Sequence, residues 1–372
     1  MRIVFDVTTC AKPHAGGIGN YGRALVAACA LHAPQHEYVL ALRPNRWLAR
    51  GELAGLLPQA PRRLLADPLA AAALAGADVL HAIGVRLPPR GRVPQVVTLH
   101  DLNVLESPEL STPEWRARRT ARIRQTLQRA DRVLSYSDQG ARSLHALLGF
   151  PRERVAVVPP GVDAARFARP PAAALSAALA RHGLDGAPYV LSLGALSERK
   201  NQRGLLAAFA RAARSGLPSE WRLVLGGPRG DDAASLREHA RQAGLPDARV
   251  LLPGFLPEAD LPAVLAGAAI YCCASLHEGF GLPVLEAQAA GAPVLSSDRG
   301  ALPETVGDCG VLFDPRDEAA FADALLRLAR DEAGRAALAQ EGPARVARDF
   351  RWDDVARRTL AVHAAAAGLA EA

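Results

Sequence analysis

Short apolar runs alternate with longer helical patterns along the whole chain. This alternation is typical of β-α-β units, in which helices cover both faces of a parallel sheet. In the first half, strands are predicted near residues 3–7, 38–42, 79–81, 96–99, 133–136 and 155–158. In the second half, they are predicted near residues 189–193, 222–225, 250–252, 270–273, 294–296 and 311–313. The pattern therefore predicts an α/β protein made of two six-stranded halves.

The stretch 159–188 separates the two halves. It begins with turn residues and contains the adjacent prolines Pro170 and Pro171, which end regular structure. We predict an N-terminal Rossmann-like lobe over residues 1–165 and a C-terminal one over residues 166–350. Helical patterns cover residues 332–350 and 352–366, and residues 351–372 are expected to form a separate C-terminal helix.

Composition agrees with a folded, two-lobed protein. The 372 residues exceed the ~250–300 at which one hydrophobic core stops growing. The five cysteines are scattered without metal-ligand spacing, so we expect buried, reduced thiols and no zinc site. The chain begins with a strand pattern and has no apolar run of the ~18 residues that a membrane span needs, so a cytoplasmic location is expected.

Positive charge is concentrated in the first half. Residues 1–165 contain 21 Lys and Arg against 13 Asp and Glu, whereas the whole chain has 44 against 38. One helical pattern carries seven arginines, Arg116, Arg118, Arg119, Arg122, Arg124, Arg129 and Arg132. They form either a solvated helix face or a peripheral contact with anionic phospholipid or a lipid-diphosphate acceptor. Nucleic-acid binding is disfavoured, because no interleaved aromatic residues or recognition motif accompany them.

The strongest local signal is SLHEGFGLPVLEAQAAGAPVLSSD, at residues 275–298. A buried strand ends in a glycine-bearing loop that opens a helix near Leu282, and the free N–H groups of a helix start suit a phosphate. Pro283 fits the first turn, where its missing N–H is harmless. Glu278 and Glu286 can hold different parts of one ligand, and a carboxylate that accepts two hydroxyl hydrogen bonds suits a sugar diol. The alternative is an ordinary strand-loop-helix with two solvated glutamates.

A second signal, VLSLGALSERKN at residues 190–201, places Arg199 and Lys200 just after a predicted strand. Two preorganised cations stabilise the charge that grows on a departing diphosphate. Taken alone, the pair is more simply an exposed basic dipeptide; together with the acidic segment, a catalytic role is favoured. No acidic metal-binding motif is evident, so we expect the basic pair to act in place of a divalent cation, with no metal and no cofactor required.

The segment GGIGNYG, at residues 16–22, formally matches the dinucleotide fingerprint through Gly17, Gly19 and Gly22. That fingerprint should follow its strand immediately, whereas residues 8–15 intervene here. The second strand also ends in Arg43 instead of an acidic residue. We therefore expect a flexible glycine loop whose amides approach a diphosphate or an acceptor, and NAD binding is the alternative.

Further candidates follow other predicted strands. His100 and Asp101 end the strand at residues 96–99, a position that faces the ligand crevice in open α/β sheets. A purely structural role for His100 is the alternative. Ser137 and Asp138 are interpreted as a helix cap. GGPRG at residues 226–230 and PGF at residues 253–255 are candidate contacts for a nucleotide base and ribose.

Taken together, these motifs resemble those of the retaining glycosyltransferases of family 4, which have the GT-B architecture. The likeness runs from GGIGNYG through LHD, VVPPGVD, LGALSERKN and LPGF to EGFGLPVLEAQAAGAPVLSSDRGALPE, and EGFGLPVLE is highly specific. It implies two Rossmann-like lobes with the donor in the cleft between them and a C-terminal helix that returns to the N-terminal lobe. The ERKN form is similar to bacterial surface-polysaccharide mannosyltransferases, including lipopolysaccharide enzymes, which implies GDP-mannose as the donor.

The resemblance also assigns roles. Arg199 and Lys200 would bind the diphosphate, Glu278 the donor sugar and Glu286 the ribose, with His100 beside the anomeric centre. The other expected donor-binding residues are Gly17, Gly194, Gly227, Phe255, Leu256, Gly279, Phe280, Gly281, Leu282, Pro283 and Val284. The expected acceptor-binding residues are Asp101, Asn20 and Tyr21. The sequence departs from the family pattern at Ala195, where many relatives carry an arginine, and Arg199 would supply that charge.

The expected reaction is a hexosyl transfer with retention. The diphosphate leaves, the acceptor hydroxyl attacks from the same face, and a leaving phosphate oxygen takes its proton, because no carboxylate is placed as a nucleophile or base. Two alternatives remain, a sugar-nucleotide epimerase of the same architecture and a non-catalytic sugar-nucleotide-binding subunit. The four charged residues Arg199, Lys200, Glu278 and Glu286 count against the second.

Overall fold

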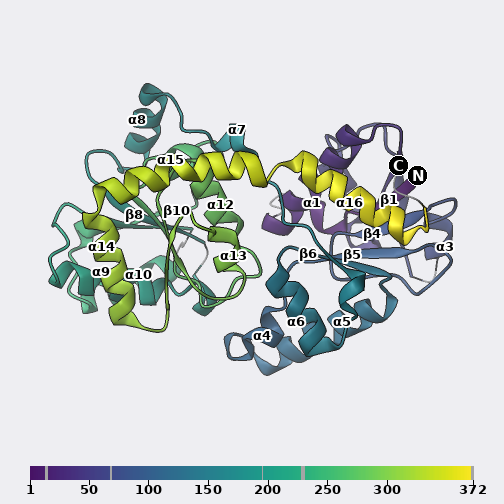
Figure 1. Ribbon diagram of the computed structural model, residues 1–372, viewed down its shortest axis with the longest axis horizontal. Helices are drawn as coiled ribbons and strands as arrows, with labels where there is room; N and C mark the ends of the chain where they lie inside the picture. The colour runs from purple at the N-terminus through teal and green to yellow at the C-terminus, as the bar shows by residue number, and fades with distance from the viewer. Residues whose placement is uncertain (13–15, 68, 195, 228–230, 370–372) are drawn as a thin grey trace. The chain divides into compact units, whose positions relative to one another are not determined.

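The computed structural model describes residues 1–12, 16–67, 69–194, 196–227 and 231–369. It forms two units, each built on one parallel sheet with helices packed against it (Figure 1). Unit 1 consists of Met1–Gly161 and Phe350–Ala372, and unit 2 consists of Val162–Asp349. The predicted α/β class with two parallel sheets is confirmed.

The sheet of unit 1 has seven strands in the order β3-β2-β1-β4-β5-β6-β7. Its strands are β1 (Arg2–Asp6), β2 (Glu37–Leu42), β3 (Arg62–Leu64), β4 (Val79–Ala82), β5 (Gln95–Leu99), β6 (Arg132–Ser135) and β7 (Val155–Val157). The prediction of six strands is wrong because it missed the edge strand β3, whose sequence RRL contains no apolar run. Strand order reverses between β1 and β4, the position where open α/β sheets bind ligands at their carboxyl ends.

Seven α-helices of unit 1 are described. They are α1 (Gly16–His32), α2 (Pro44–Trp47), α3 (Ala70–Ala73), α4 (Asn103–Glu106), α5 (Pro113–Arg129), α6 (Asp138–Leu148) and α16 (Trp352–Ala366). The Ser137 hydroxyl caps α6 by accepting a 3.0 Å hydrogen bond from the Gly140 N–H, as the sequence predicts.

The glycine-rich segment GGIGNYG begins helix α1, so the prediction of a flexible loop over residues 16–22 is wrong. Gly22 lies so close to the strand ends that a Cβ there would be 2.5 Å from the Cys10 Sγ and 2.7 Å from the Ile83 Cγ2. At this position, glycine therefore permits close packing of a helix against the sheet. Residues 13–15 lie outside the described residues.

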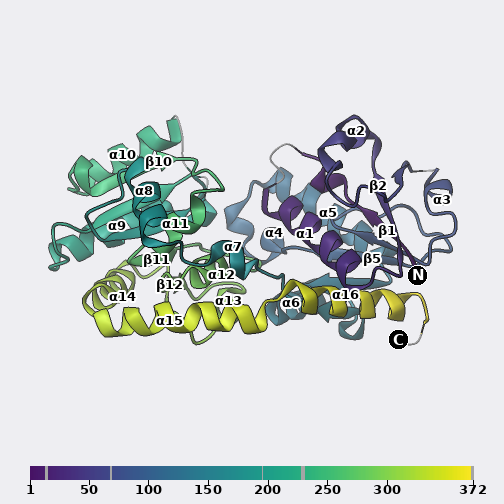
Figure 2. The ribbon, with the colours of Figure 1, turned by 90° about the horizontal axis from the view of Figure 1, so that it is seen from above.

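Helix α16 belongs to unit 1 and packs against α1 (Figure 2). Its Trp352 ring lies against Gly161, where a Cβ would be 2.7 Å from the indole. The centroid of the Trp352 ring lies 5.9 Å from that of the Tyr21 ring. Further along, the imidazole of His363 contacts that of His81 on β4 at 2.9 Å, and His81 contacts the Thr98 Oγ1 at 2.8 Å. Both histidines are fully buried, and burial lowers the pKa of His363 to about 3 and the pKa of His81 well below its ordinary value, so both rings are neutral.

The sheet of unit 2 has six strands in the order β10-β9-β8-β11-β12-β13, so its order reverses between β8 and β11. The strands are β8 (Tyr189–Leu193), β9 (Arg222–Gly226), β10 (Val250–Gly254), β11 (Ile270–Cys273), β12 (Val294–Ser297) and β13 (Val311–Phe313). The helices are α7 (Ala164–Phe167), α8 (Ala172–Arg181), α9 (Gln202–Arg214), α10 (Asp231–Gln242), α11 (Leu261–Ala266), α12 (Leu282–Ala289), α13 (Leu302–Val306), α14 (Glu318–Arg330) and α15 (Glu332–Asp349).

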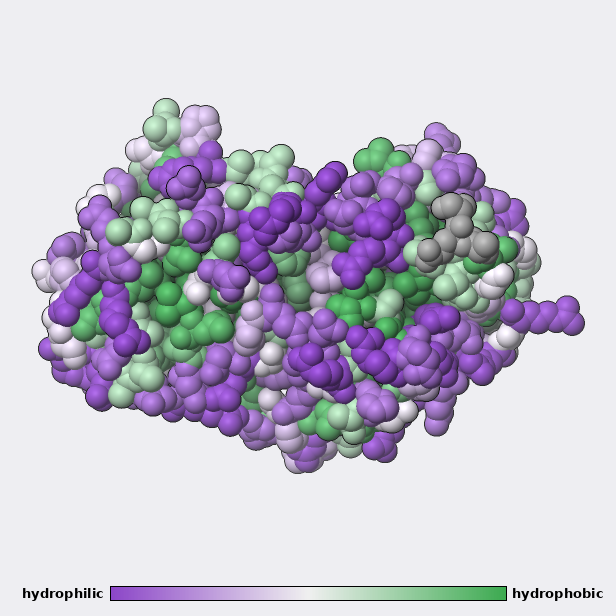
Figure 3. Space-filling view, viewed as in Figure 1, coloured by the Kyte–Doolittle hydropathy of each residue, from purple (hydrophilic) through white to green (hydrophobic). Residues whose placement is uncertain are grey.

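Each unit has its own apolar core between the sheet and its helices. All five cysteine thiols are free and buried, as predicted. Among the described residues, no helix is both long and apolar enough to span a bilayer. Hydrophilic residues cover much of the face seen in Figure 3, with smaller hydrophobic areas between them.

Candidate functional site

The candidate site of unit 2 lies where its strand order reverses. Strands β8 and β11 are hydrogen-bonded neighbours, although β8 ends at Leu193 and β11 begins only at Ile270. The loops that follow the two strands therefore meet at one edge of the sheet. The Arg199 carbonyl accepts a hydrogen bond from the Leu276 N–H at 2.8 Å, and the Arg199 Nη1 donates to the His277 carbonyl at 3.0 Å. Sheet topology thus brings the basic segment beside the acidic one.

A short 3-10 helix, η5 (Glu198–Lys200), carries the two cations. The Ser197 side chain caps it by accepting from the Lys200 N–H at 3.3 Å, and Asn201 ends it in the left-handed region at φ 52°. Gly194 has φ +143°, and the stem of Lys200 packs beside it, where a Cβ would lie 3.3 Å from the Lys200 Cε. The backbone of this loop therefore directs both basic side chains to the same place.

Glu278 stands at the centre of the charged cluster. Its Oε2 is 2.7 Å from the Arg199 Nη1, and its Oε1 is 2.7 Å from the Lys200 Nζ and accepts from the Ser275 hydroxyl at 2.8 Å. The side chain of Glu278 is only 11% exposed. Burial alone would raise the pKa of this carboxyl, but Lys200 and Arg199 outweigh it and lower the pKa below its ordinary value. Glu278 is therefore a carboxylate that holds both cations in position.

The loop after Glu278 is shaped by the segment that precedes α13. The Ala301 N–H donates to the Glu278 carbonyl at 3.0 Å, and the Thr305 hydroxyl donates to the Phe280 carbonyl at 2.5 Å. Gly300 has φ +61°, and a Cβ at this position would lie 2.3 Å from the Glu278 carbonyl oxygen. Only glycine fits this contact, so residues 300–305 fix the backbone of the glutamate loop.

Helix α12 begins at the end of this loop. Its N-cap is Gly281, at φ +100°, a conformation that L side chains rarely adopt. Pro283 has no N–H, and the Val284 N–H already donates to the Gly281 carbonyl at 2.9 Å. The loop residues Gly279 and Gly281 and the first helical residue Leu282 therefore carry amides that a phosphate would meet at this helix start.

Glu286 lies one turn inside α12 and differs from Glu278 in its surroundings. No hydrogen bond to its carboxylate is found in the described part of the chain. Burial raises the pKa of Glu286 to about 7; Arg166 on α7 opposes this shift, and Glu258 after β10 adds to it. Arg166 itself forms an ion pair with Glu258 at 3.3 Å. Half-buried and without a partner, the Glu286 carboxylate is available to accept ligand hydroxyls.

Two further strand ends complete this edge of unit 2. The Gly227 N–H donates to the Gly254 carbonyl at 2.7 Å, which ties the ends of β9 and β10 together. Leu256 is buried, whereas Phe255 is 58% exposed. Exposed aromatic surface at a strand end is compatible with stacking on a base. Ala195 and the PRG portion of GGPRG, residues 228–230, lie outside the described residues.

The candidates of unit 1 gather at the carboxyl ends of its own strands. The His100 Nε2 donates to the Ile83 carbonyl, and its Nδ1 accepts from the Tyr136 hydroxyl at 2.5 Å. Burial lowers the pKa of His100 to about 4, so its imidazole is neutral. Tyr21 is also buried, against the rings of Tyr136 and His100. His100 and Tyr21 therefore belong to a packed aromatic cluster in this structure.

The remaining unit 1 candidates lie closer to solvent. Gly17 and Asn20 are exposed in the first turns of α1, and the half-buried Asp101 accepts from the Asn103 N–H at 3.3 Å. His100 and Asp101 follow β5 directly, as the sequence predicts. The placement of His100 beside an anomeric centre stays a prediction.

Sequence reasoning missed three residues that support the site. Ser275 precedes Glu278 by three residues and donates a hydrogen bond to its carboxylate, and Gly300 packs against the Glu278 backbone. The charge of Arg166 opposes the rise in the pKa of Glu286. The short spacing between Ser275 and Glu278 could have predicted the hydrogen bond between their side chains. The other two contacts depend on tertiary packing. Within the described ranges, no cluster of His, Cys, Asp and Glu suits a metal ion.

Comparison with known families gives two matches along the chain. The model of the glycosyl transferases group 1 matches residues 178–345, and the model of glycosyltransferase family 4 matches residues 15–166. The O-antigen chain mannosyltransferase B of Escherichia coli is 32% identical over 270 residues, 71% of this chain and 68% of that protein. A D-inositol 3-phosphate glycosyltransferase of Salinispora arenicola is 36% identical over 310 residues, 77% of this chain and 68% of that protein.

Solved structures share the fold. Anabaena Alr3699/HepE, solved in complex with UDP, superposes with a TM-score of 0.78 at 21% identity, covering 98% of this chain and 100% of that one. The lipopolysaccharide outer core galactosyltransferase WaaB superposes with a TM-score of 0.68 at 16% identity, covering 97% of this chain and 99% of that one.

Proposed function

Because the chain belongs to the glycosyltransferases, joining a family 4 segment to a group 1 segment, we propose that it is a retaining hexosyltransferase that uses a nucleotide diphosphate sugar. The observation that carries the proposal is the cluster of Arg199, Lys200 and Glu278 at the strand-order reversal of unit 2, beside the start of α12. Preorganised cations and helix-start amides stabilise the charge that develops on a departing diphosphate.

In the proposed reaction, Lys200 and Arg199 bind the diphosphate while Glu278 keeps them in place and accepts a hydrogen bond from the donor sugar. Glu278 has carboxylate lone pairs beyond those used by Ser275 and the two cations. The Glu286 carboxylate binds the ribose hydroxyls, and unit 1 supplies the acceptor site. The acceptor hydroxyl forms its bond on the face that the diphosphate leaves, and a diphosphate oxygen takes the acceptor proton. The residues act without a metal or cofactor.

For the donor, we propose GDP-mannose, and for the acceptor, a glycan or lipid-linked glycan of cell-surface polysaccharide synthesis. Support comes from the O-antigen chain mannosyltransferase B, which is 32% identical to this chain. The test is mass spectrometry of products, with NMR to determine their configuration, after incubation with a panel of nucleotide sugars, including GDP-mannose and UDP-glucose, with and without an acceptor glycan. Transfer from GDP-mannose with the anomeric configuration retained is expected. A changed sugar nucleotide without acceptor would indicate an epimerase, and no turnover of any donor would indicate a binding subunit.

A pH dependence of donor binding follows from Glu286. Burial raises the pKa of this carboxyl to about 7, and only the ionised form accepts two ribose hydroxyls. The KM for the donor is therefore expected to rise as pH falls from 8 to 6, as Glu286 takes up a proton. In Glu286→Gln this component should disappear, leaving a higher KM that does not change over this pH range, because both phosphates of a nucleotide diphosphate sugar are substituted at both ends and stay fully ionised. Parallel KM profiles for the wild type and Glu286→Gln would contradict the role of Glu286.

We also propose that the enzyme works in the cytoplasm, at the inner face of the membrane, through exposed arginines of α5. Arg116, Arg129 and Arg132 donate to main-chain carbonyls of unit 1, whereas Arg118 and Arg122 are exposed. Trp115, 52% exposed, lies on the same helix with the Arg118 guanidinium 6.0 Å from its ring centroid. Tryptophan and arginine both favour a lipid headgroup layer.

The membrane contact is tested by co-sedimentation with phosphatidylglycerol vesicles. Replacement of Arg118, Arg119 and Arg122 together by glutamine is expected to lower the bound fraction strongly, since each basic residue near an anionic surface contributes ~1 kcal/mol. Phosphatidylcholine vesicles serve as the control surface. An unchanged bound fraction would rule out this contact.

A further inference from the structure

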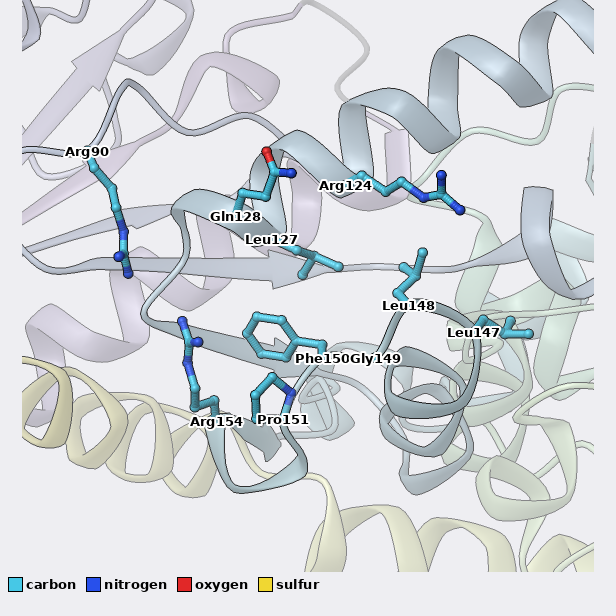
Figure 4. Close-up of a pocket in the computed structure, with 10 residues that line it drawn as sticks. All are labelled: Arg90, Arg124, Leu127, Gln128, Leu147, Leu148, Gly149, Phe150, Pro151 and Arg154. Atoms are coloured by element: carbon cyan, nitrogen blue, oxygen red, sulfur yellow. The ribbon is translucent and has the colours of Figure 1, made fainter.

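A pocket of about 450 Å³ lies in unit 1 beside the end of α5. We call it the α5–α6 pocket, and Figure 4 shows its lining. The lining residues are Arg90, Arg124, Leu127, Gln128, Leu147, Leu148, Gly149, Phe150, Pro151 and Arg154. Those from 149 to 154 lead into β7, and Arg90 precedes β5, so the pocket lies at the amino ends of these strands. His100 and Asp101 follow β5 at its other end, and the pocket is therefore separate from the strand ends expected to bind substrate.

The charge of the pocket is positive. Three of its ten lining residues are arginines and none is acidic. The Arg154 Nε donates to the Asp131 carbonyl at 2.9 Å, and its guanidinium lies 4.8 Å from the Phe150 ring centroid. Arg90 forms an ion pair with Asp131 at 2.7 Å and is 56% exposed. Arg124 is exposed, and no partner for its guanidinium is found among the described residues. The Asp131 carboxylate neutralises only one of the three guanidinium groups, so the pocket keeps a net positive charge that attracts an anion.

Apolar side chains form the rest of the pocket. Phe150 and Leu127 are 5% and 8% exposed, and Leu148 is half-buried beside them. Leu147 is 46% exposed, although it is a large hydrophobic residue. In Figure 4, Leu127 and Phe150 lie between the side chains of Arg90 and Arg154 on one side and of Leu148 on the other. An inorganic anion would use the arginines alone, whereas a ligand with an apolar portion next to an anionic group would use both surfaces.

We propose that the α5–α6 pocket binds the phosphate group and adjoining acyl portion of an anionic phospholipid. Helix α5 supplies Arg124, Leu127 and Gln128 to the pocket, and the exposed Trp115, Arg118 and Arg122 that carry the membrane contact proposed above lie on earlier turns of the same helix. The proposal rests on that contact and deepens it from a general attraction to a discrete lipid site. It does not depend on the glycosyl transfer reaction.

The test uses the full chain and soluble short-chain lipids below their micellar concentration. Isothermal titration calorimetry with dihexanoyl phosphatidylglycerol should show saturable binding, with weaker binding of dihexanoyl phosphatidylcholine and of inorganic phosphate. Arg124→Gln should weaken phosphatidylglycerol binding about fivefold, and Leu147→Asn by roughly threefold or more. Both positions are exposed, so folding should be retained. The matched control is Arg211→Gln, which removes an exposed arginine from α9 in unit 2 and should leave binding unchanged.

Each other outcome overturns the lipid site. Equal affinity for inorganic phosphate would mean that the apolar residues take no part, and affinities unchanged by Arg124→Gln and Leu147→Asn would place the lipid elsewhere. If vesicle binding depends on Arg118, Arg119 and Arg122 while short-chain lipid does not bind, the helix contact stands without the pocket. Transfer to a soluble acceptor, measured in the same variants, should be unchanged and separates this result from failure of the proposed reaction.

Discussion

Replacing Lys200 with alanine is expected to slow glycosyl transfer on the order of 10²-fold or more, the usual cost of removing a preorganised group that stabilises transition-state charge. The Lys200 Nζ is 2.7 Å from the Glu278 Oε1 and the Lys200 side chain is 22% exposed, so its charge is held in a partly buried position before any donor binds. The effect should appear mainly in kcat, because charge on the diphosphate grows as the bond to the sugar breaks. The measurement is steady-state transfer from the donor identified by the panel.

A neighbouring basic residue provides the control for Lys200→Ala. Arg203 lies one helical turn further on in α9, donates to the Ser235 hydroxyl at 3.2 Å and faces solvent. Arg203→Ala removes the same charge and should change the rate less than about twofold. Near-normal turnover of Lys200→Ala would show that the departing diphosphate is stabilised by other groups.

The substitution Glu278→Gln is expected to separate binding from catalysis. Its kcat should fall about 10²-fold, because the variant loses the charge that orients Lys200 and Arg199 and that accepts from the donor sugar. Affinity for the free nucleoside diphosphate should be kept or increased, since both cations would then face the phosphates without an internal counter-ion. Kinetics and direct titration with the nucleoside diphosphate measure the two quantities independently.

Glu198→Gln is the matched control for Glu278→Gln. Glu198 belongs to η5, beside Arg199, but its side chain is exposed. The same change of charge there should leave both quantities nearly unchanged. If Glu278→Gln weakened nucleoside diphosphate binding as much as it lowered kcat, Glu278 would serve only to hold the loop together.

The strands that could be predicted from the sequence are those with a clear run of apolar residues. Strands β8, β11 and β13 were predicted at their observed bounds because each is a compact apolar run between turn residues. Strand β3 was missed because two of its three residues are arginines, and only pairing with β2 makes it a strand. The start of α1 was missed because its glycine-rich sequence predicted a loop. Its glycines favour a loop locally, while the need of Gly22 to approach Cys10 and Ile83 is a tertiary requirement.

The candidate site was predictable in its residues but not in its pairings. The sequence marked Arg199, Lys200 and Glu278 as candidates, and the family resemblance gave the cations to the diphosphate and the glutamate to the sugar, but neither indicated that these side chains contact one another. That Glu278 contacts both cations depends on β8 lying beside β11. The different protonation of the two glutamates was also beyond sequence reasoning. Glu278 has two cations within 2.7 Å, whereas Glu286 is half-buried with no hydrogen-bond partner among the described residues, and neither environment is encoded by their eight-residue spacing.

The position of α16 in unit 1 has a consequence for synthesis of the protein. Unit 2 is one continuous stretch, whereas unit 1 needs α16 to cover α1 and to place His363 against His81. Because the ribosome makes the chain from its N-terminus, the unit that emerges first must wait for its last helix. Unit 2 can complete its core while the nascent unit 1 still has an open face. A chain that stops at Asp349 would keep unit 2 but leave unit 1 permanently exposed to chaperones and proteases.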